Sequence, residues 1–119
     1  MVSCLIVDDN AGFLAAAARL LRRQGLDVVG TAHDGVEAER LAGELRPDVV
    51  LMDIDLGGES GLEVTARLCR ESELPIVLIS THAEQDYRDL IAASPAAGFL
   101  AKTDLSAAAI LELLGRSQH

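Results

Sequence analysis

The sequence has few aromatic residues, few cysteines and no long apolar run, and each shortage excludes a class of protein. Tryptophan is absent and the aromatic residues are one Tyr and two Phe, so a buried core must be built from aliphatic side chains. No apolar stretch approaches the roughly 20 residues of a membrane-spanning helix. Cys4 and Cys69 are too few for a disulfide framework and lack metal-site spacing. We expect them to be small core residues in a reducing cytoplasm.

Basic residues are also scarce relative to acidic ones. The 119 residues include 19 Asp and Glu against 10 Lys and Arg, which gives a formal net charge of -9. Because nucleic-acid binding depends largely on neutralising phosphates, we do not expect this chain to bind nucleic acid directly. The charge favours binding of cations or of a basic partner surface. The N-terminus has neither a basic leader nor a signal-peptide cleavage site, which predicts a cytoplasmic protein without a membrane partner.

The sequence does contain a regular alternation of short apolar runs and amphipathic segments. Its length suits one domain, residues 1–119. Five short apolar runs predict strands that are buried on both faces. They are Ser3–Val7, Leu26–Ala32, Val49–Asp53, Ile76–Ser80 and Gly98–Ala101. Because the segments between and after them predict helices, we expect an α/β fold with a parallel sheet covered on both faces.

Capping residues mark where the first three helices begin. Asn10 precedes a helical stripe of apolar residues that starts at Phe13, and Gly25 is expected to end that helix. Asp34 and Ser60 each have a Glu three residues later, which is the capping-box pattern. These signals predict a helix after each of the first three strands.

The last two helices have weaker signals. Residues 86–93 have a poor helical pattern, and Pro95 cannot lie inside that helix. For the final helix we expect Thr103 or Asp104 as the N-terminal cap and Gly115 as the end. The alternation of five strands and five helices is then complete.

Polar residues suited to phosphate chemistry stand at the ends of four predicted strands. They are Asp8 and Asp9 after the first, Asp53 and Ser80 at the ends of the third and fourth, and Lys102 after the fifth. In a parallel sheet these positions meet at one edge, where such folds bind ligands. Three neighbouring carboxylates repel one another unless a cation joins them, and oxygen ligands indicate Mg²⁺. Aspartate can accept a phosphoryl group, while a lysine and a hydroxyl supply charge and a hydrogen bond to it.

These five residues, in this order and spacing, resemble the site of the receiver domain of two-component response regulators. The resemblance covers nearly all of the chain. It implies a flavodoxin-like, doubly wound (βα)5 three-layer sandwich with a parallel five-stranded sheet of order 2-1-3-4-5. It also implies that Asp53 accepts a phosphoryl group, in a Mg²⁺-dependent reaction, from a sensor histidine kinase or a small phosphodonor.

The resemblance assigns further roles at the metal site. Asp9 and Asp53 would bind Mg²⁺ directly, together with the backbone carbonyl of Asp55. Asp8 would act mainly through a metal-bound water. The domain would not be an enzyme with a separate substrate, but a phosphoacceptor that assists its own phosphorylation and dephosphorylation.

The resemblance also implies a switch. Phe99 stands at the aromatic switch position, which couples to the hydroxyl residue Ser80. Asp55 and His82 lie at positions that tune the lifetime of the phosphoryl group in this family. Phosphorylation is then expected to change a signalling surface and, in some family members, to drive formation of a homodimer.

Two residues depart from the family pattern. Thr103 follows Lys102 where the family often has Pro, and Gly57 stands in the loop after Asp53 where Pro is usual. Regulators with a helix-turn-helix output often lack the first Pro as well. The departure therefore indicates that subclass, with a C-terminal DNA-binding output domain outside this chain and a role in transcription regulation.

Two other functions remain as alternatives. Asp53-Ile54-Asp55, followed later by Ser80 and Lys102, also resembles the motifs of haloacid-dehalogenase-type phosphatases. In that family, however, the Asp-x-Asp strand comes first and the acidic pair last; turnover of a generic phosphate ester would favour it. The second alternative is a receiver-like module that binds partners without phosphorylation, although every expected site residue is present. Nucleotide binding is disfavoured because neither G-x-G-x-x-G nor a P-loop occurs.

Overall fold

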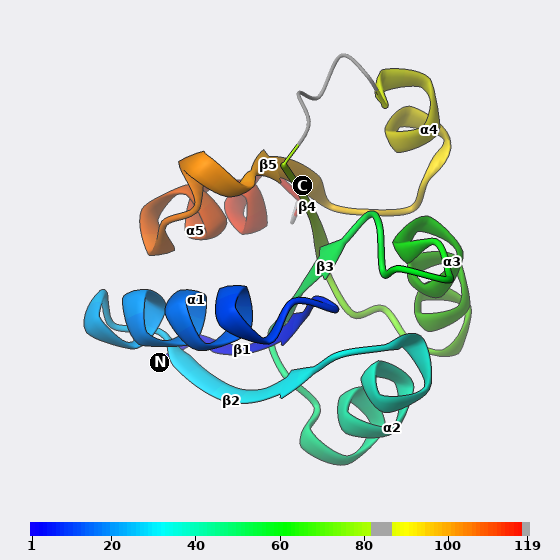
Figure 1. Cartoon of the computed structure of the whole chain (residues 1–119). Coiled ribbons are helices and arrows are strands. Elements are labelled where there is room, and N and C mark those ends of the chain that lie inside the picture. The colour runs from blue at the N-terminus through cyan, green and yellow to red at the C-terminus, as the bar shows by residue number, and fades with distance from the viewer. Residues whose placement is uncertain (82–86, 118–119) are drawn as a thin grey trace.

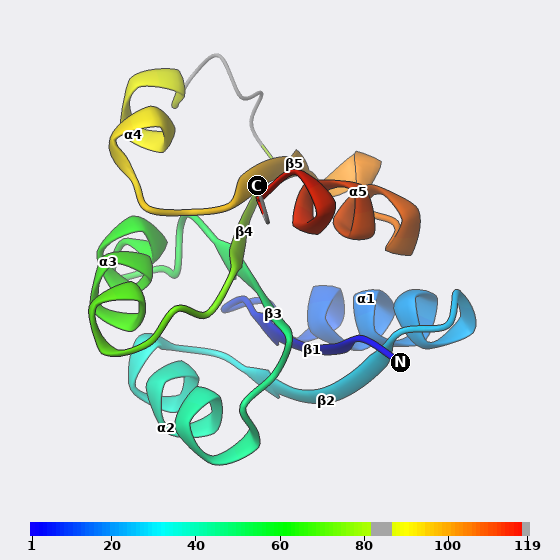
Figure 2. The same cartoon turned by 180° about the vertical axis from the view of Figure 1, so that it is seen from behind.

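The computed structural model describes residues 1–81 and 87–117, which form a parallel five-stranded sheet between two layers of helices (Figures 1 and 2). The elements are β1 Ser3–Val7, α1 Ala11–Arg23, β2 Asp27–Ala32, α2 Gly35–Leu45, β3 Val49–Asp53, α3 Gly61–Glu71, β4 Ile76–Ser80, α4 Arg88–Ala93, β5 Gly98–Ala101, the 3-10 helix η2 Lys102–Asp104, and α5 Ala107–Ser117. The strand order is β2-β1-β3-β4-β5 and every pairing is parallel. The predicted fold class and strand order are therefore confirmed.

The sheet has two faces, each covered by its own set of helices. Helices α1 and α5 cover one face, and α2, α3 and α4 lie on the other (Figure 1). Fully buried examples are Ile6, Leu21, Leu51 and Ile110 on the first face, and Leu5, Met52, Val64 and Leu78 on the second. Because successive strand residues point to opposite faces, a strand covered on both sides must be apolar throughout. That requirement explains the continuous apolar runs of β1, β3 and β4.

The core is aliphatic, as the composition predicts. Phe13, Tyr87 and Phe99 pack against the two core layers but are only partly buried. Cys4 is a fully buried core residue, and burial raises the pKa of its thiol to about 12. Cys69 is half-buried on α3. No helix in the described part of the chain is both long and apolar enough to cross a membrane.

The first helix begins and ends where the sequence predicts. The Asn10 side chain accepts a hydrogen bond from the Phe13 N–H at 3.0 Å, which satisfies one of the free amide groups of the first turn. At the other end Gly25 has φ +98°, a left-handed conformation that a glycine adopts without strain. Helix α1 is therefore fixed at both ends by its own sequence.

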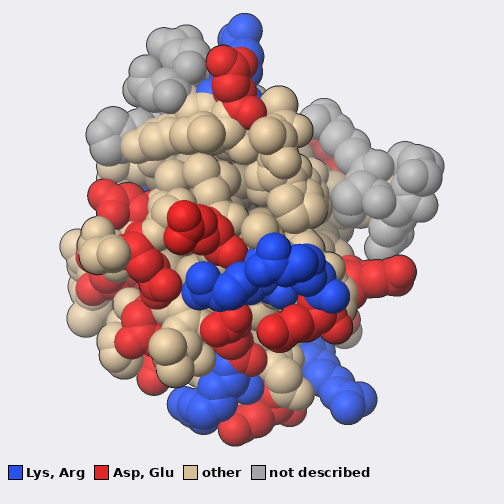
Figure 3. All heavy atoms as spheres, turned by 90° about the vertical axis from the view of Figure 1, so that its right-hand side faces the viewer, with Lys and Arg blue, Asp and Glu red and all other residues tan. Residues whose placement is uncertain are grey.

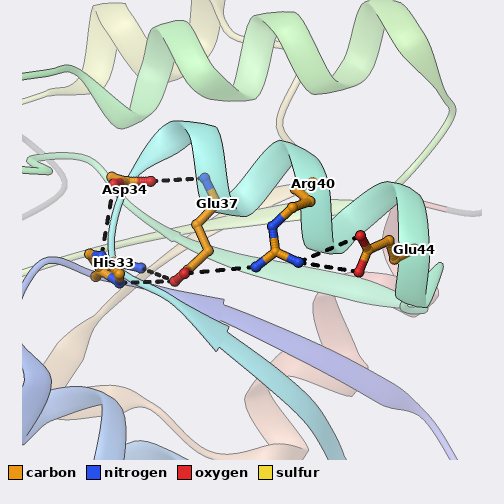
Figure 4. Close-up of polar contacts among 5 residues, drawn as sticks. All are labelled: His33, Asp34, Glu37, Arg40 and Glu44. Atoms are coloured by element: carbon orange, nitrogen blue, oxygen red, sulfur yellow. Dashed lines mark hydrogen bonds and ion pairs between the residues drawn. The ribbon is translucent and has the colours of Figure 1, made fainter.

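The α2 N-terminus shows a shifted version of the predicted capping box (Figure 4). Asp34 Oδ1 accepts from the Glu37 N–H at 2.8 Å, as expected. The Glu37 carboxylate accepts from the backbone N–H of His33 at 3.1 Å, one residue earlier than the pattern predicts. Farther along the same exposed side, Arg40 pairs with Glu44 at 3.3 Å. Such solvent-exposed helix pairs stabilise by only a few tenths of a kcal/mol, about 0.3–0.5 each.

The predicted ends of the last helix are wrong. Thr103 and Asp104 lie in η2, and the helix begins at Ala107, three residues after η2 ends. The cap is Ser106, whose hydroxyl accepts from the Ala109 N–H at 3.0 Å. The 3-10 turn delays the helix, and a capping pattern in the sequence does not reveal such a turn. The helix also continues through Gly115 to Ser117, because a glycine in a helix is unfavourable but tolerated.

Helix α4 is the least anchored helix in the described part of the chain. Its predicted first residue, Asp86, lies outside the described residues; the helix spans Arg88–Ala93 and ends ahead of Pro95, as expected. None of its residues is buried, and Leu90 is 55% exposed. Segments with few buried contacts open at low free-energy cost. By contrast, α2 and α3 are joined by an ion pair between Glu39 and Arg67 at 3.0 Å, on the side where acidic and basic groups intermix (Figure 3).

Candidate functional site

The carboxyl ends of β1, β3 and β5 bring together the acidic and basic residues that the sequence places there. One carboxylate oxygen from each of Asp8, Asp9 and Asp53 lies within 4.8 Å of the others. Asp8 is fully buried and Asp53 is 6% exposed, whereas Asp9 is exposed. The cluster thus opens to solvent on the side of Asp9.

Lys102 supplies the positive charge of the site. Its Nζ lies 2.6 Å from Asp8 Oδ2 and 3.4 Å from Asp53 Oδ2. Burial by itself lowers the pKa of Lys102, but hydrogen bonding and charge from Asp8 and Asp53 outweigh it, so the pKa is raised overall. The lysine is therefore a permanent cation. Three carboxylates against one ammonium leave two negative charges in excess.

Asp8 has both carboxylate oxygens engaged by the protein. Oδ1 accepts from the backbone N–H of Asn10 at 2.9 Å, while Oδ2 faces Lys102. Its own N–H donates to the Ala32 carbonyl at 3.0 Å, which extends the β1–β2 pairing past the end of the strand. Asp8 is therefore locked in place, and Asp9 is the more accessible member of the acidic pair.

Asp53 is held in an unfavourable environment for a charged group. Burial raises the pKa of its carboxyl from 3.8 to about 6, and the charge of Asp8 adds to the rise. Lys102 and the Asp55 N–H, which donates to Asp53 Oδ1 at 3.3 Å, oppose it. A cation that entered beside Asp53 would relieve both the repulsion from Asp8 and the cost of burial.

The loop after Asp53 explains the departure at Gly57. This residue has φ +77°, which a proline cannot adopt because its ring holds φ near -65°. A Cβ at Gly57 would lie only 3.1 Å from Asp9 Oδ2. The Gly57 N–H donates to Asp55 Oδ1 at 3.1 Å. Farther on, a Cβ at Gly61 would overlap the Asp53 carbonyl oxygen, so the loop closes tightly against the site.

The two predicted switch residues lie on neighbouring strands and on the same face of the sheet. Ser80 is 3% exposed at the end of β4 and pairs with Ala101 of β5. Phe99 stands two residues before Ala101 and is partly buried against the core layer beneath α3 and α4. Residues two apart on a strand share a face, and Phe99 pairs with Leu78, two residues before Ser80. Phe99 and Ser80 therefore lie on the same face of neighbouring strands. His82 lies outside the described residues.

Phe13 is a site residue that the sequence pattern assigned only to the apolar face of α1. The Lys102 Nζ lies over its ring, 4.3 Å from the ring centre. The contact joins residues from opposite ends of the chain, so helical periodicity cannot reveal it. The available signal was an aromatic residue in the first helical turn after an acidic pair.

The donors present fit a divalent cation that prefers oxygen ligands. Carboxylates from three residues converge, negative charge is in excess, and one carboxylate is exposed. These are the ligand types that Mg²⁺ takes, with water completing the coordination. The same arrangement sets the Asp53 carboxylate, a nucleophile, 3.4 Å from a fixed ammonium. The buried hydroxyl residue Ser80 ends the neighbouring strand β4 at the same edge of the sheet.

Comparison with known proteins gives a consistent set of matches. A family model described as the response regulator receiver domain matches residues 4–114. The transcriptional regulatory protein LiaR of Bacillus subtilis is 36% identical over 109 residues, which cover 90% of this chain and 52% of that protein. The response regulator GacA of Pseudomonas aeruginosa is 36% identical over 104 residues, which cover 86% of this chain and 49% of that protein. The chain thus spans about half the length of these curated relatives.

A solved structure agrees with these matches. The signal receiver domain of the putative response regulator NarL from Mycobacterium tuberculosis superposes with a TM-score of 0.80 at 31% identity. The superposition covers 98% of this chain and 96% of that chain. The likeness therefore extends over the whole sheet and both helical layers.

The raised pKa of Asp53 predicts how stability depends on pH when metal is chelated. Since the folded pKa of about 6 exceeds the unfolded 3.8, the folded state holds more protons between these values, and stability falls as pH rises through them. Asp53→Asn removes that loss. We expect this substitution to raise the free energy of unfolding at pH 7 by about 1–2 kcal/mol. This gain is smaller than the pKa shift alone implies, because solvent that enters beside Asp9 screens the charges.

The gain should shrink toward zero at pH 4, and urea unfolding at several pH values measures it. Asp55→Asn, whose side chain is exposed, is the matched control and should show no such trend. A gain from Asp53→Asn that is the same at pH 4 and pH 7 would contradict the explanation by burial and repulsion.

Proposed function

The chain belongs to the response regulator receiver domain family, as its five site residues predict, and we propose that Asp53 is the residue that accepts the phosphoryl group. The observation that carries this proposal is the buried Asp8–Asp53 pair sharing one ammonium, with Asp53 at the end of the central strand β3. Family membership leaves no support for the haloacid-dehalogenase alternative.

The proposed reaction transfers the phosphoryl group from a donor to a carboxylate oxygen of Asp53. That oxygen attacks phosphorus, the bond from phosphorus to the leaving group breaks, and the leaving group departs with the electron pair. Lys102 then pairs with a phosphoryl oxygen instead of the Asp53 carboxylate, and the Ser80 hydroxyl donates to another. The domain is a phosphoacceptor; we propose that it has no separate substrate and that these residues also assist dephosphorylation.

We propose Mg²⁺ as the cation of the site, held by Asp8, Asp9, Asp53 and the backbone carbonyl of Asp55. When bound, it would supply positive charge between the carboxylates and the incoming phosphoryl group. Both oxygens of Asp8 are engaged, by Lys102 and by the Asn10 N–H, whereas Asp9 is exposed. This difference favours Asp9 as a direct ligand and Asp8 as a ligand through water.

The metal proposal predicts unequal effects of two neighbouring substitutions. Asp9→Ala should weaken Mg²⁺ binding by about tenfold or more, a loss of roughly 1.4 kcal/mol. Asp8→Ala should weaken it less, because its oxygens are already occupied. Calorimetric titration of each variant with MgCl₂ measures the dissociation constants. Equal losses from the two variants would show that the acidic pair acts as a unit.

The phosphoacceptor proposal predicts one covalent modification. Incubation with acetyl phosphate and Mg²⁺ should add the mass of a single phosphoryl group. Of the two described carboxylates that contact Lys102, that of Asp53 is partly accessible at 8% exposure, whereas that of Asp8 is fully buried. Asp53→Asn and chelation of the metal should each abolish the gain, while Asp55→Asn should keep it. Intact-mass spectrometry reads the result.

The other outcomes are equally informative. No gain in the wild-type protein would favour the phosphorylation-independent binding module. A gain that persists in Asp53→Asn would move the phosphoacceptor to another residue.

The biological setting follows as part of the proposal. We propose that residues 1–119 form one receiver domain that works in the cytoplasm and takes its phosphoryl group from a sensor histidine kinase. The names of LiaR and GacA point to regulatory proteins about twice as long as this chain, the former transcriptional. A C-terminal DNA-binding output domain is therefore the proposed target of the switch, with a phosphorylation-dependent homodimer as its means. Nucleic-acid contact would belong to that domain and not to this acidic one.

The switch proposal joins Ser80 to Phe99. Phosphorylation adds about -1.5 to -2 units of charge and three acceptor oxygens at Asp53. If the Ser80 side chain moved toward one of these oxygens, it would leave space behind it on this face of the sheet. The Phe99 ring, on the same face, would turn to fill that space. Helix α4, which has no buried residue, is the element most easily displaced by that turn. The changed surface would then consist of α4, β5 and α5.

Hydrogen exchange with and without beryllofluoride, a phosphoryl mimic, measures the predicted change. Protection should change across residues 80–102 as well as around the acidic site, and Phe99→Leu should reduce the distant part only. Changes confined to the surroundings of Asp8, Asp9 and Asp53 would mean that the site binds the mimic without transmitting a signal.

A further inference from the structure

The ammonium of Lys102 is surrounded by groups of two kinds. Asp8 and Asp53 lie at hydrogen-bonding or ion-pair distance, and the face of the Phe13 ring lies 4.3 Å away. We propose that Phe13 is a positioning residue for phosphoryl transfer, which holds the Lys102 ammonium at the two carboxylates through a cation–π contact. This inference rests on the proposed phosphorylation of Asp53.

Phe13 belongs to a closed ring of contacts that includes Asp8. Asp8 Oδ1 accepts from the Asn10 N–H at 2.9 Å, and the Asn10 side chain accepts from the Phe13 N–H at 3.0 Å. The Phe13 ring contacts the Lys102 ammonium, and that ammonium forms an ion pair with Asp8 Oδ2 at 2.6 Å. The start of α1 and the end of β1 thereby fix the ring relative to Asp8. Lys102, from the far end of the chain, completes the ring of contacts by touching both Phe13 and Asp8.

An aromatic ring does what an aliphatic side chain of similar size cannot. A lysine ammonium is strongly hydrated and sits on a flexible four-carbon stem, so apolar contact alone would drive it toward water. The negative face of an aromatic ring attracts the cation while still excluding water. The ring also takes no hydrogen bond, so all three donors of the ammonium remain free for carboxylate and phosphoryl oxygens.

The core does not require an aromatic residue at position 13. None of the buried hydrophobic residues in the described part of the chain is aromatic, and Phe13 itself is only partly buried. The two other aromatic residues, Tyr87 and Phe99, pack on the opposite face of the sheet. The contact with Lys102 therefore explains an aromatic residue at position 13 better than a need to fill the core does.

Positioning matters because the ammonium must meet charge that develops during the transfer. A lysine already held at Asp53 needs no ordering when the phosphoryl group arrives. Loss of the ring should leave the donor binding site intact but let the ammonium swing outward. We therefore expect the phosphorylation rate at saturating acetyl phosphate to fall, with little change in the half-saturating concentration.

A fluorination series at position 13 tests this inference directly. Successive fluorines on the ring keep its shape and withdraw electrons from its face, so they weaken a cation–π contact without altering the packing. The rate should fall stepwise with each added fluorine. Phe13→Leu should lower it by about threefold to tenfold, and Phe13→Tyr should restore it to nearly the wild-type value. Leu20→Ala, a partly exposed apolar residue on the same helix, is the control and should leave the rate unchanged.

A second readout needs no chemistry at Asp53. The chain contains only two Phe, so a protein labelled with fluorophenylalanine gives two ¹⁹F resonances. Lys102→Met should shift the Phe13 resonance, which the Phe13→Leu variant identifies by its absence. An unchanged resonance would overturn the contact itself.

The outcomes separate this inference from the function it rests on. Equal rates across the fluorination series, in a protein whose phosphorylation depends on Asp53, would overturn the positioning role alone. A wild-type protein that takes up no phosphoryl group would overturn the proposed function and this inference with it.

Discussion

Two buried carboxylates that share one ammonium are the interaction on which the site depends. Asp53 ends the central strand β3, Asp8 directly follows the neighbouring strand β1, and Lys102 reaches both from just after β5. Removing charges from water is costly, and a single cation only partly offsets two buried carboxylates and the nearby Asp9. The remaining negative charge makes the site receptive to a divalent cation, and the raised pKa of Asp53 expresses the same imbalance.

The fold supplies the rigidity that this imbalance requires. Strands β1, β3 and β4 are buried on both faces, so the residues at their ends cannot move away from one another without disturbing the core. Gly57 and Gly61 let the following loop close against Asp9 and Asp53: a Cβ would be tight against Asp9 at Gly57 and would collide with the Asp53 carbonyl at Gly61. Helix α4, by contrast, contributes no buried residue. A fixed site next to a loosely held helix is the arrangement that a local charge change can turn into a surface change.

The sequence predicted the fold well where burial on both faces dictates the residues. Four of the five strands have the predicted ends, because a strand inside a covered sheet must be a continuous apolar run. The fifth, β2, starts one residue later than predicted. The start of α5 was mispredicted because the 3-10 turn Lys102–Asp104 precedes the helix and moves the cap to Ser106. The order of the site residues identified the family, since strand ends in a parallel sheet meet at one edge. The contact between Phe13 and Lys102 was missed because it joins opposite ends of the chain through space.

The most direct test of this account is chemical mapping of the phosphorylated carboxylate. Borohydride reduces an aspartyl phosphate to homoserine, which remains in place through digestion and peptide sequencing by mass spectrometry. Trypsin should give a peptide spanning 41–67, because the bond between Arg46 and Pro47 resists cleavage. We predict homoserine at position 53 and at no other position. Homoserine at position 8, 9 or 55 would contradict it, since the carboxylate that Lys102 and β3 hold ready would then not be the one that reacts.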